Sequence, residues 1–458
     1  MTTNKNTRRD FLRGGVHASM LGALSSLGLL SAGPAQAQAT GYKALVCLYL
    51  FGGNDGNNMI VPLDAQRSQA YKAIRGSSGL ALSLADKTLV AARSAKTQAV
   101  LQPVTQEFAF HYGMPELDAL YGQGKVAAVL NVGSLHEPMT RDKYLAGTAL
   151  PPQLFSHPDQ TLQNLSGSAA ATGTGWGGRL VDLLGSGSPL DAVTLGGGGL
   201  FVEGANTHGN QIPANGQLRL AGMDFWPQKE ADVRHEALRA ILGSDNPNKL
   251  QAAANRSLLN GMDLANKLSA ASGGAPFATP FPPTELGAQF KTVAQLIRMG
   301  AQQNSGRQVY FVSLGGFDTH TGQSFQQFDM LRRVSQAVAA FQLALAEFQA
   351  EDKVTTFTMS DFGRTLVPNS GGTDHAWGNH QLVIGGGVKG GLYGNFPSFE
   401  LNKHDDATGR GVWVPQFSNQ QLGATLGQWF GAHPADLDVK VFKGELSRFA
   451  LPDLGFMT

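Results

Sequence analysis

Short apolar runs without polar alternation recur along the chain, and each ends at glycine or another turn residue. Residues 44–51 read ALVCLYLF and lead into Gly-Gly-Asn-Asp-Gly. Similar runs cover residues 125–132, 308–314, 354–359 and 382–384. A continuous apolar run of this length, closed by turn residues, is typical of a strand buried on both faces. We therefore expect buried strands at these five segments.

Helical patterns lie between the predicted strands. Phe290, Val293, Ile297 and Ala301 recur at three- and four-residue steps, and residues 331–348 show the same spacing. Strands that alternate with such helices predict an α/β fold, with a mostly parallel central sheet covered by helices on both faces. Ligands bind such sheets just beyond the carboxyl ends of the strands.

The middle of the chain, residues 151–283, has a different pattern. Helical segments are expected around 230–242 and 250–268, and residues 271–283 are rich in Gly and Pro, as in a linker. We expect a single domain over residues 40–458, with this middle region as an elaboration inserted into the sheet domain.

The N-terminus predicts export. Arg8 and Arg9 precede a Phe-Leu pair, a weakly apolar stretch follows at 14–30, and two overlapping Ala-x-Ala sites lie at 35–39. This is the order of a twin-arginine signal peptide. The apolar stretch is too short and interrupted to span about 30 Å of hydrocarbon well. We expect residues 1–39 to be a cleaved signal, the twin-arginine (Tat) translocase to be a partner during export, and the protein to be periplasmic or secreted.

Composition narrows the classes of partner. The formal net charge is +1 and no long basic or acidic block occurs, which argues against nucleic-acid and membrane-surface partners. Beyond the signal, no stretch approaches the ~18 apolar residues of a membrane helix, so we expect no membrane insertion after cleavage. Cys47 is the single cysteine, so stability depends on core burial and not on an internal disulfide.

Four polar clusters follow the predicted strands or lie in the loops that the strands open. They span residues 52–58, 134–142, 315–320 and 360–380. Each cluster alone has a plain explanation as a turn, a helix cap or an ordinary loop. In a parallel sheet, however, all four meet at one edge. Asp and His without thiolates are the ligand set of a catalytic divalent metal, and two such ions clamp a phosphoryl-type group.

These clusters resemble the motifs of DUF1501, a family of exported bacterial proteins of unestablished function. The resemblance covers nearly the whole mature chain. It rests on the motifs Phe51–Gly56, Leu154–Gln160, Gly175–Arg179, Gly316–His320, Asp361–Thr365, Gly372–His375 and Gly455–Met457.

The family in turn resembles the alkaline phosphatase and sulfatase superfamily in the order of its motifs. That resemblance implies an alkaline phosphatase-like fold and a role for each matching residue. Asp318 and His320 would hold one ion, and Asp361 would hold a second ion with Asp55 and Thr140. His375 would be the late histidine, with His380 as its rival, and Asp374 would be a further metal ligand. Thr140 would be the nucleophile, with Arg141 or Arg364 binding the transferred group.

The chain departs from the superfamily pattern at three points. The superfamily's Asp-His dipeptide reads Asp361-Phe362, so one ligand of the second ion is missing. The spacing between Asp318 and His320 is shorter than usual. Thr140 lacks a strong nucleophile signature, and Ser134 and Ser156 remain alternatives. One ion site is therefore expected to be intact and the other weak or lost.

The sequence leads to one function and two alternatives. We expect an exported metal-dependent hydrolase of phosphate or sulfate esters, acting on a small-molecule or polymer ester with one or two divalent ions (zinc, manganese, calcium or magnesium). The first alternative is a non-catalytic periplasmic binding or assembly protein on a degenerate alkaline phosphatase-like scaffold. The second is an ion bound purely for structure.

Overall fold

A computed structural model describes residues 41–97, 105–170, 172–216, 218 and 227–458. The predicted signal peptide, including Arg8 and Arg9, lies outside the described residues. Among the described helices, none is long and apolar enough to cross a membrane.

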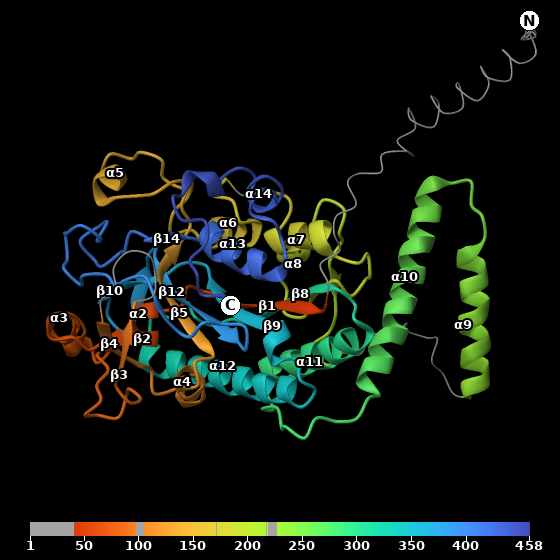
Figure 1. Ribbon diagram of the computed structural model, residues 1–458, viewed down its shortest axis with the longest axis horizontal. Helices are drawn as coiled ribbons and strands as arrows, with labels where there is room; N and C mark the ends of the chain where they lie inside the picture. Colours follow the sequence, from red (N-terminus) through yellow and green to blue (C-terminus); the bar gives the residue numbers. More distant parts are fainter. Residues whose placement is uncertain (1–40, 98–104, 171, 217, 219–226) are drawn as a thin grey trace, which may run out of the picture. The chain divides into compact units, whose positions relative to one another are not determined.

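The core of the molecule is one sheet in the order β13-β5-β12-β9-β1-β8-β6-β7, with β14 also paired to β5 (Figure 1). The strands are β1 Lys43–Leu50, β5 Val126–Gly133, β6 Ala192–Thr194, β7 Asn210–Gln211, β8 Arg307–Leu314, β9 Val354–Ser360, β12 Asn379–Gly385, β13 Gly391–Tyr393 and β14 Phe417–Ser418. The five predicted strands are all present, and the predicted mostly parallel α/β sheet is confirmed.

Strand β12 is the exception to the parallel arrangement. It pairs antiparallel with both β5 and β9, whereas β1 pairs parallel with β8 and with β9. Residues 361–378 contain no helix that could carry the chain back across the sheet, so β12 begins at the edge where β9 ends. The carboxyl ends of β1, β5, β8 and β9 and the start of β12 therefore share one edge of the sheet.

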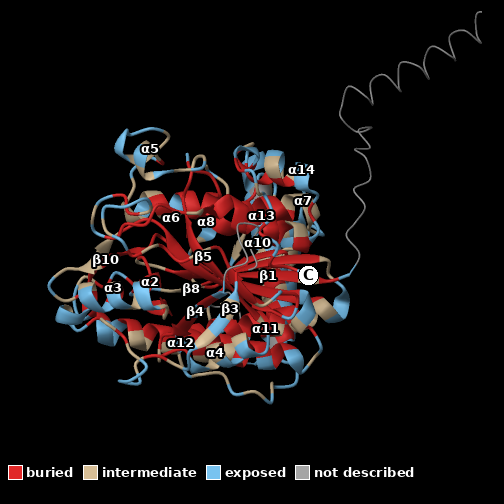
Figure 2. Ribbon diagram, turned by 60° about the vertical axis from the view of Figure 1, so that its left-hand side comes forward, coloured by how far each residue is buried: buried red, intermediate tan, exposed pale blue. Residues whose placement is uncertain are grey.

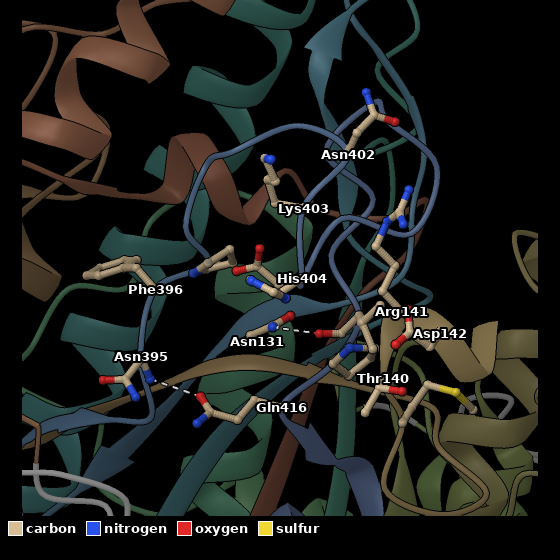
Figure 3. A pocket seen from close by; sticks show the side chains of 15 residues that line it. Asn131, Thr140, Arg141, Asp142, Asn395, Phe396, Asn402, Lys403, His404 and Gln416 are labelled. Atoms are coloured by element: carbon tan, nitrogen blue, oxygen red, sulfur yellow. Dashed lines mark hydrogen bonds between the residues drawn. The ribbon is translucent and has the colours of Figure 1, made fainter. Parts of the chain in front are cut away.

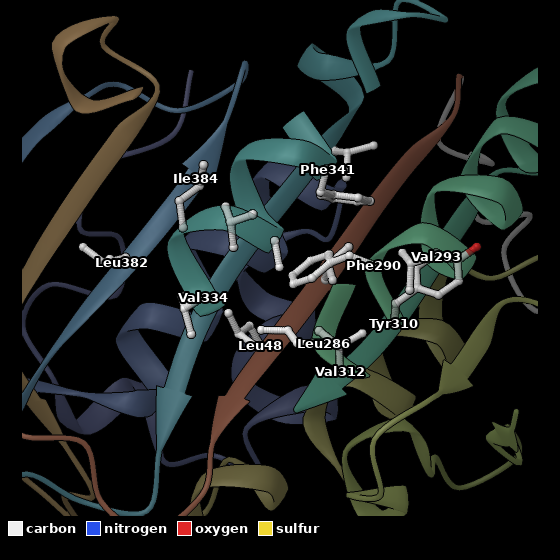
Figure 4. Close-up of a cluster of buried hydrophobic side chains, with 14 of the residues drawn as sticks. Leu48, Leu286, Phe290, Val293, Tyr310, Val312, Val334, Phe341, Leu382 and Ile384 are labelled. Carbon is white, nitrogen blue, oxygen red and sulfur yellow. The ribbon is translucent and has the colours of Figure 1, made fainter. Parts of the chain in front are cut away.

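Helices cover both faces of the sheet (Figures 1 and 2). One face carries α4 Pro115–Gly122, α11 Glu285–Gln303 and α12 Gln323–Ala346, and the other carries α6 His157–Ser166, α7 Trp176–Leu184, α8 Gly199–Val202 and α13 Asn419–Phe430. Alternate residues of β1 pack into hydrophobic cores on opposite faces of the sheet. Leu48 packs with Phe290 and Phe341 on the first face (Figure 4). Leu45 and Tyr49 belong to the core on the second face. Burial on both faces explains the unbroken apolar run.

The middle region belongs in large part to the sheet domain itself. Its β6 and β7 extend the sheet beyond β8, and α6, α7 and α8 cover one face. The two expected helices are present as α9 Gln228–Gly243 and α10 Lys249–Ser272, which pack on each other and, through α10, on α11 (Figure 1).

Smaller elements surround the carboxyl-terminal edge. They are α2 Gly56–Met59, β2 Ile60–Pro62, α3 Ala65–Arg75, β3 Arg93–Lys96, β4 Thr105–Phe110, α5 Arg141–Leu145, β10 Arg364–Pro368 and β11 Thr373–His375. The short helix α14 Pro434–Asp436 follows α13, whose last residues contact the first residues of β1 and β8. Strands β2, β4 and β3 form a small sheet, and β10 pairs antiparallel with β11. The β10–β11 pair brings residues from the loop after β9 back over the sheet edge.

Candidate metal centre

Three side chains from distant parts of the chain converge at the carboxyl-terminal edge. Nε2 of His157 lies 3.1 Å from Nε2 of His375, and Oδ1 of Asp318 lies 3.5 Å and 3.2 Å from these two atoms. Ligands about 2.0–2.2 Å from one divalent ion, at angles of 90–110°, are separated by roughly 2.8–3.6 Å. The three atoms therefore have the spacing of one face of a metal coordination shell.

A fourth donor adjoins this set. Nε2 of His320 lies 3.0 Å from Nε2 of His375 and 3.1 Å from Oδ1 of Asp318. Two of the four residues follow β8, one ends β11 and one begins α6. Close packing of the loops sets their positions: Gly52 has a φ of +111°, and a Cβ there would lie 2.4 Å from the Asp318 backbone nitrogen, so only glycine fits.

The remote nitrogen of each histidine faces an acceptor. Nδ1 of His375 donates to the Phe155 carbonyl at 2.9 Å. Nδ1 of His157 lies 2.6 Å from Oδ2 of Asp361, and Nδ1 of His320 lies 3.2 Å from Oδ1 of Asp374. This arrangement places the hydrogen on Nδ1 and turns three Nε2 lone pairs toward one another and toward a carboxylate. Such histidine–acceptor pairs are the usual outer contacts of metal ligands.

The pKa shifts of Asp318 and His375 favour the protonation states that metal ligands need. Burial raises the pKa of Asp318, but the hydrogen bond and charge of Arg364 outweigh it and hold that pKa below its ordinary value. Burial lowers the pKa of His375, and the hydrogen bond to Phe155 offsets this only in part. An ionised Asp318 beside a neutral His375 is the pair of states that a cation requires. Burial raises the pKa of Asp361 despite its bond to His157.

Arg364 is fully buried and is committed to the loops of the centre. It donates to the carbonyls of Gly52, Gly53 and Thr373 at 2.8, 2.9 and 2.6 Å, and to Oδ1 of Asp318. The sequence predicted that this guanidinium binds a transferred anionic group. In the structure, Arg364 instead binds the Asp318 carboxylate, and it links the turn that follows β1 with the first residue of β11.

Asp55, expected as the first metal ligand, lies in a buried ion pair. Nη1 and Nη2 of Arg75 lie 2.6 Å and 3.2 Å from its carboxylate oxygens, and neither side chain is exposed. Asp55 also accepts from Gln323 and caps α2 by accepting from the Asn57 backbone nitrogen. Its negative charge is already matched by a guanidinium. The second-ion set of Asp55, Asp361 and Thr140 is therefore not assembled.

Thr140 and Arg141 lie at a different pocket. Thr140 is the exposed N-cap of α5 and accepts from the Lys143 backbone nitrogen at 3.3 Å. Nε of Arg141 donates to the Asp406 carbonyl. Both residues line a cavity that includes none of the four converging donors. The structure thus does not bring the expected nucleophile to the metal centre.

Both alternative nucleophiles, Ser134 and Ser156, donate a hydrogen bond to another side chain. Ser134 is buried and donates to Oδ1 of Asn164 at 2.9 Å. Ser156 precedes His157 directly and donates to Oδ2 of Asp159 in the first turn of α6. Of the three candidate hydroxyls, only Ser156 adjoins the centre along the chain.

His380 lies in the core of the sheet, on β12. Its Nδ1 accepts from the Asn131 backbone nitrogen at 3.1 Å, and burial lowers its pKa to about 3. It packs against Phe396. Of the two rival histidines, His375 is the one that joins the cluster.

Phe362 follows Asp361 directly, at the position where the sequence resemblance implied a histidine ligand. Its ring centroid lies 4.7 Å from the ring centroids of both His157 and His375. The Phe362 ring packs against the two imidazoles and supplies no ligand atom. The arrangement has the donors of one ion and lacks a second complete set among the described residues.

Sequence reasoning did not select His157 as a ligand. The signal was present in the Ser156-His157-Pro158-Asp159 motif, but there the serine was the residue considered. His157 begins a helix and does not follow a strand, so the rule about strand ends could not identify it.

The fold and this cluster define an α/β protein with a His/Asp centre at the carboxyl edge of a mostly parallel sheet. The chain belongs to the family described as "Protein of unknown function (DUF1501)", whose model matches residues 42–422. The predicted membership is confirmed. No curated protein matches the sequence.

Several solved structures share distant similarity with the chain. A sulfatase from Pseudoalteromonas sp. is 12% identical with a TM-score of 0.36, covering 95% of this chain and 76% of that one. A lipoteichoic acid synthase from Listeria monocytogenes is 8% identical with a TM-score of 0.34 and coverages of 90% and 78%. A phosphonate monoester hydrolase from Silicibacter pomeroyi is 10% identical with a TM-score of 0.32 and coverages of 70% and 69%. Similarity at this level carries no argument about activity.

Proposed function

We propose that the protein is an exported metal-dependent hydrolase of phosphate or sulfate esters. The observation that carries the proposal is the convergence of three imidazole Nε2 atoms on Oδ1 of Asp318, each imidazole having an acceptor at Nδ1. Without a cation or a proton between them, lone pairs 3.0–3.1 Å apart repel one another. The donor set therefore fits a divalent ion. Nitrogen and oxygen ligands without sulfur suit zinc or manganese.

A divalent ion bound there supplies positive charge to polarise a phosphoryl or sulfuryl oxygen. The chain's own residues orient its ligands. Arg364 fixes Asp318, Asp361 fixes the ring of His157, and the Phe155 carbonyl fixes the tautomer of His375. The side chain of Asp318 is 47% exposed, so a substrate reaches the centre from solvent.

The test uses the mature chain, residues 40–458. Metal content is quantified after purification, the metal is stripped, and zinc, manganese, calcium and magnesium are returned singly. Aryl phosphate monoesters, phosphate diesters and sulfate esters serve as substrates. We expect turnover with at least one ion, and its loss in Asp318→Ala. His208→Ala is the matched control, because the His208 side chain is 82% exposed and its one partner among residues 41–97, 105–170, 172–216, 218 and 227–458 is Glu203. Protein that binds no ion, or stays inert with every ion, contradicts the proposal.

A second candidate is a non-catalytic metal-binding protein on the same scaffold. It is favoured by the surroundings of the three candidate hydroxyls: Thr140 lines a cavity apart from the metal centre, and Ser134 and Ser156 donate to Asn164 and Asp159. It predicts stoichiometric metal binding, lost in Asp318→Ala, with no turnover of any ester. The same experiments therefore separate the two candidates.

The export part of the proposal rests on the twin-arginine pattern in the sequence. Replacing Arg8 and Arg9 by Lys keeps the charge and removes the pattern. We expect the variant to accumulate in the cytoplasm as uncleaved precursor, whereas the wild-type protein is recovered outside it and shortened. Equal export of both proteins contradicts the assignment.

A further inference from the structure

The cavity lined by Thr140 and Arg141 lies at the carboxyl end of β5, and its lining includes none of the donors of the metal centre. Its volume is about 700 Å³, within the range of roughly 300–1,000 Å³ typical of small-molecule sites. Figure 3 shows Asn395 and Phe396 on one side, Arg141 and Asp142 on the other, and His404 between them. Nothing in the proposed hydrolysis uses this cavity.

The lining concentrates polar side chains that have no partner of their own. The side chains of Asn395, Asn402, Lys403 and His404 make no hydrogen bond or ion pair with another residue in the described parts of the chain. Gln416 accepts from the Asn395 backbone nitrogen at 2.9 Å and keeps its amide hydrogens free within the same ranges. The loop of residues 395–404 thus lines this cavity with two side-chain amides, one imidazole and one ammonium group.

The walls of the cavity are held in place by contacts behind them. Asn131 has a left-handed φ of +54°, and its Nδ2 donates to the Val414 carbonyl at 2.8 Å. The Asp406 carboxylate accepts from the Asn402 and Val412 backbone nitrogens at 2.8 and 3.1 Å. A site whose backbone is fixed before binding loses less entropy when a ligand enters.

The free groups indicate the chemistry of the ligand. Side-chain amides both donate and accept hydrogen bonds, as do the hydroxyls of a sugar. Lys403 and the terminal nitrogens of Arg141 add positive charge. Asp405 also lines the cavity, and both of its carboxylate oxygens already accept hydrogen bonds from the Ser398 amide and hydroxyl at 2.6 Å. Asp142 is the second acidic residue of the lining.

We propose that this cavity binds a saccharide that carries an anionic substituent. The assignment stands apart from the proposed hydrolysis, since it rests on a cavity whose lining contains none of His157, Asp318, His320 and His375. The anionic group has carboxylate, sulfate or phosphate chemistry, and the probes below distinguish these sources.

The test is calorimetric titration of the mature protein with a tetragalacturonate, a chondroitin sulfate tetrasaccharide, a hexose phosphate and neutral maltotetraose. We expect at least one acidic probe to bind at least tenfold more tightly than maltotetraose. Asn402→Gly removes the amide and keeps the backbone, because Asn402 has a φ of +61° that glycine adopts freely. This variant and Lys403→Ala should each weaken binding at least tenfold.

Lys440→Ala is the matched control, because Lys440 lies on the surface in an ion pair with Asp436 and does not line the cavity. Binding to Lys440→Ala and to metal-stripped protein should match the untreated wild type. Absence of binding by every acidic probe at millimolar concentration overturns the proposal. Unchanged binding in the two cavity variants, or loss of binding on metal removal, overturns it as well.

Discussion

His157 and Asp361, 204 positions apart in the chain, form a close contact of 2.6 Å between Nδ1 and Oδ2. Asp361 is itself held by the Gly52 backbone nitrogen at 3.2 Å, and its other oxygen has no partner among the described residues. A carboxylate that orients an imidazole in this way sets both the ring position and the tautomer. Asp361, expected as a direct ligand, thus lies behind a ligand that the sequence did not indicate.

The first prediction concerns this contact. Asp361→Asn keeps the shape and removes the charge, so His157 loses its orienting carboxylate while the fold is retained. We expect metal affinity to fall by about 10–100-fold, the usual effect of removing an outer contact of a metal ligand. Competition with a chromophoric chelator measures the affinity. A variant with unchanged affinity would show that Asp361 does not act through His157.

The second prediction concerns the number of ions. Phe362 packs against His157 and supplies no ligand atom beside Asp361, and Asp55 is paired with Arg75. We expect one tightly bound ion per chain by mass spectrometric metal analysis, reduced to none in His375→Ala. Two ions per chain in the wild type would contradict the single-ion reading. The exposed-histidine variant His208→Ala should retain one ion.

The sequence predicts the strands well for a physical reason. Strands covered on both faces must be apolar at every position, and this leaves a pattern that needs no knowledge of the fold. The sequence did not predict that β12 runs antiparallel to its neighbours, because this direction depends on a connection from β9 that stays at one edge of the sheet. The short strands β6 and β7 were missed, since two or three residues form no pattern.

The candidate centre was predictable only where its residues follow strands. Asp318 and the segment containing His375 lie in loops after β8 and β9, and the structure places them at one sheet edge as expected. Asp55 also follows a strand, yet Arg75 neutralises it through tertiary packing that local sequence does not reveal. His157 begins a helix from the region regarded as an elaboration. Ligands contributed by such a region need the fold before they can be assigned.

The third prediction separates Thr140 from the chemistry. Thr140→Val removes the hydroxyl that caps α5, and we expect a loss of about 1 kcal/mol or less in stability. Ester hydrolysis and metal content should not change, because Thr140 lines the cavity at the carboxyl end of β5 and not the metal centre. Steady-state kinetics with the best ester substrate checks this. A large loss of kcat with the metal retained would restore Thr140 as the nucleophile, and Ser156→Ala provides the parallel comparison.

The fourth prediction concerns acid stability. Burial lowers the pKa of His380 to about 3, below its ordinary value of 6.5. Between these values the unfolded chain binds a proton that the folded chain does not, so the free energy of unfolding falls as pH decreases through this window and is independent of this group above it. From pH 7 to pH 5 the loss is about 2 kcal/mol for one such histidine.

Urea unfolding of His380→Gln at the two pH values tests this. The variant should lose about 2 kcal/mol less than the wild type on acidification, whatever its stability at pH 7. His208→Gln, at an exposed position, should follow the wild type. Equal acid sensitivity of His380→Gln and wild type would contradict a buried neutral His380.

The last prediction concerns the Asp55–Arg75 pair. Both side chains have 0% exposure, and Arg75 also donates to the Thr365 and Leu366 carbonyls at 2.9 Å. Arg75→Met leaves a buried carboxylate without its partner, at a cost of about 3–5 kcal/mol in stability. Adding Asp55→Leu removes that unpaired charge, so we expect the double variant to be more stable than Arg75→Met alone. Thermal and urea unfolding measure this coupling. If Asp55 were instead a metal ligand, Asp55→Leu would abolish metal binding in the folded double variant, whereas the ion pair predicts that the ion is retained.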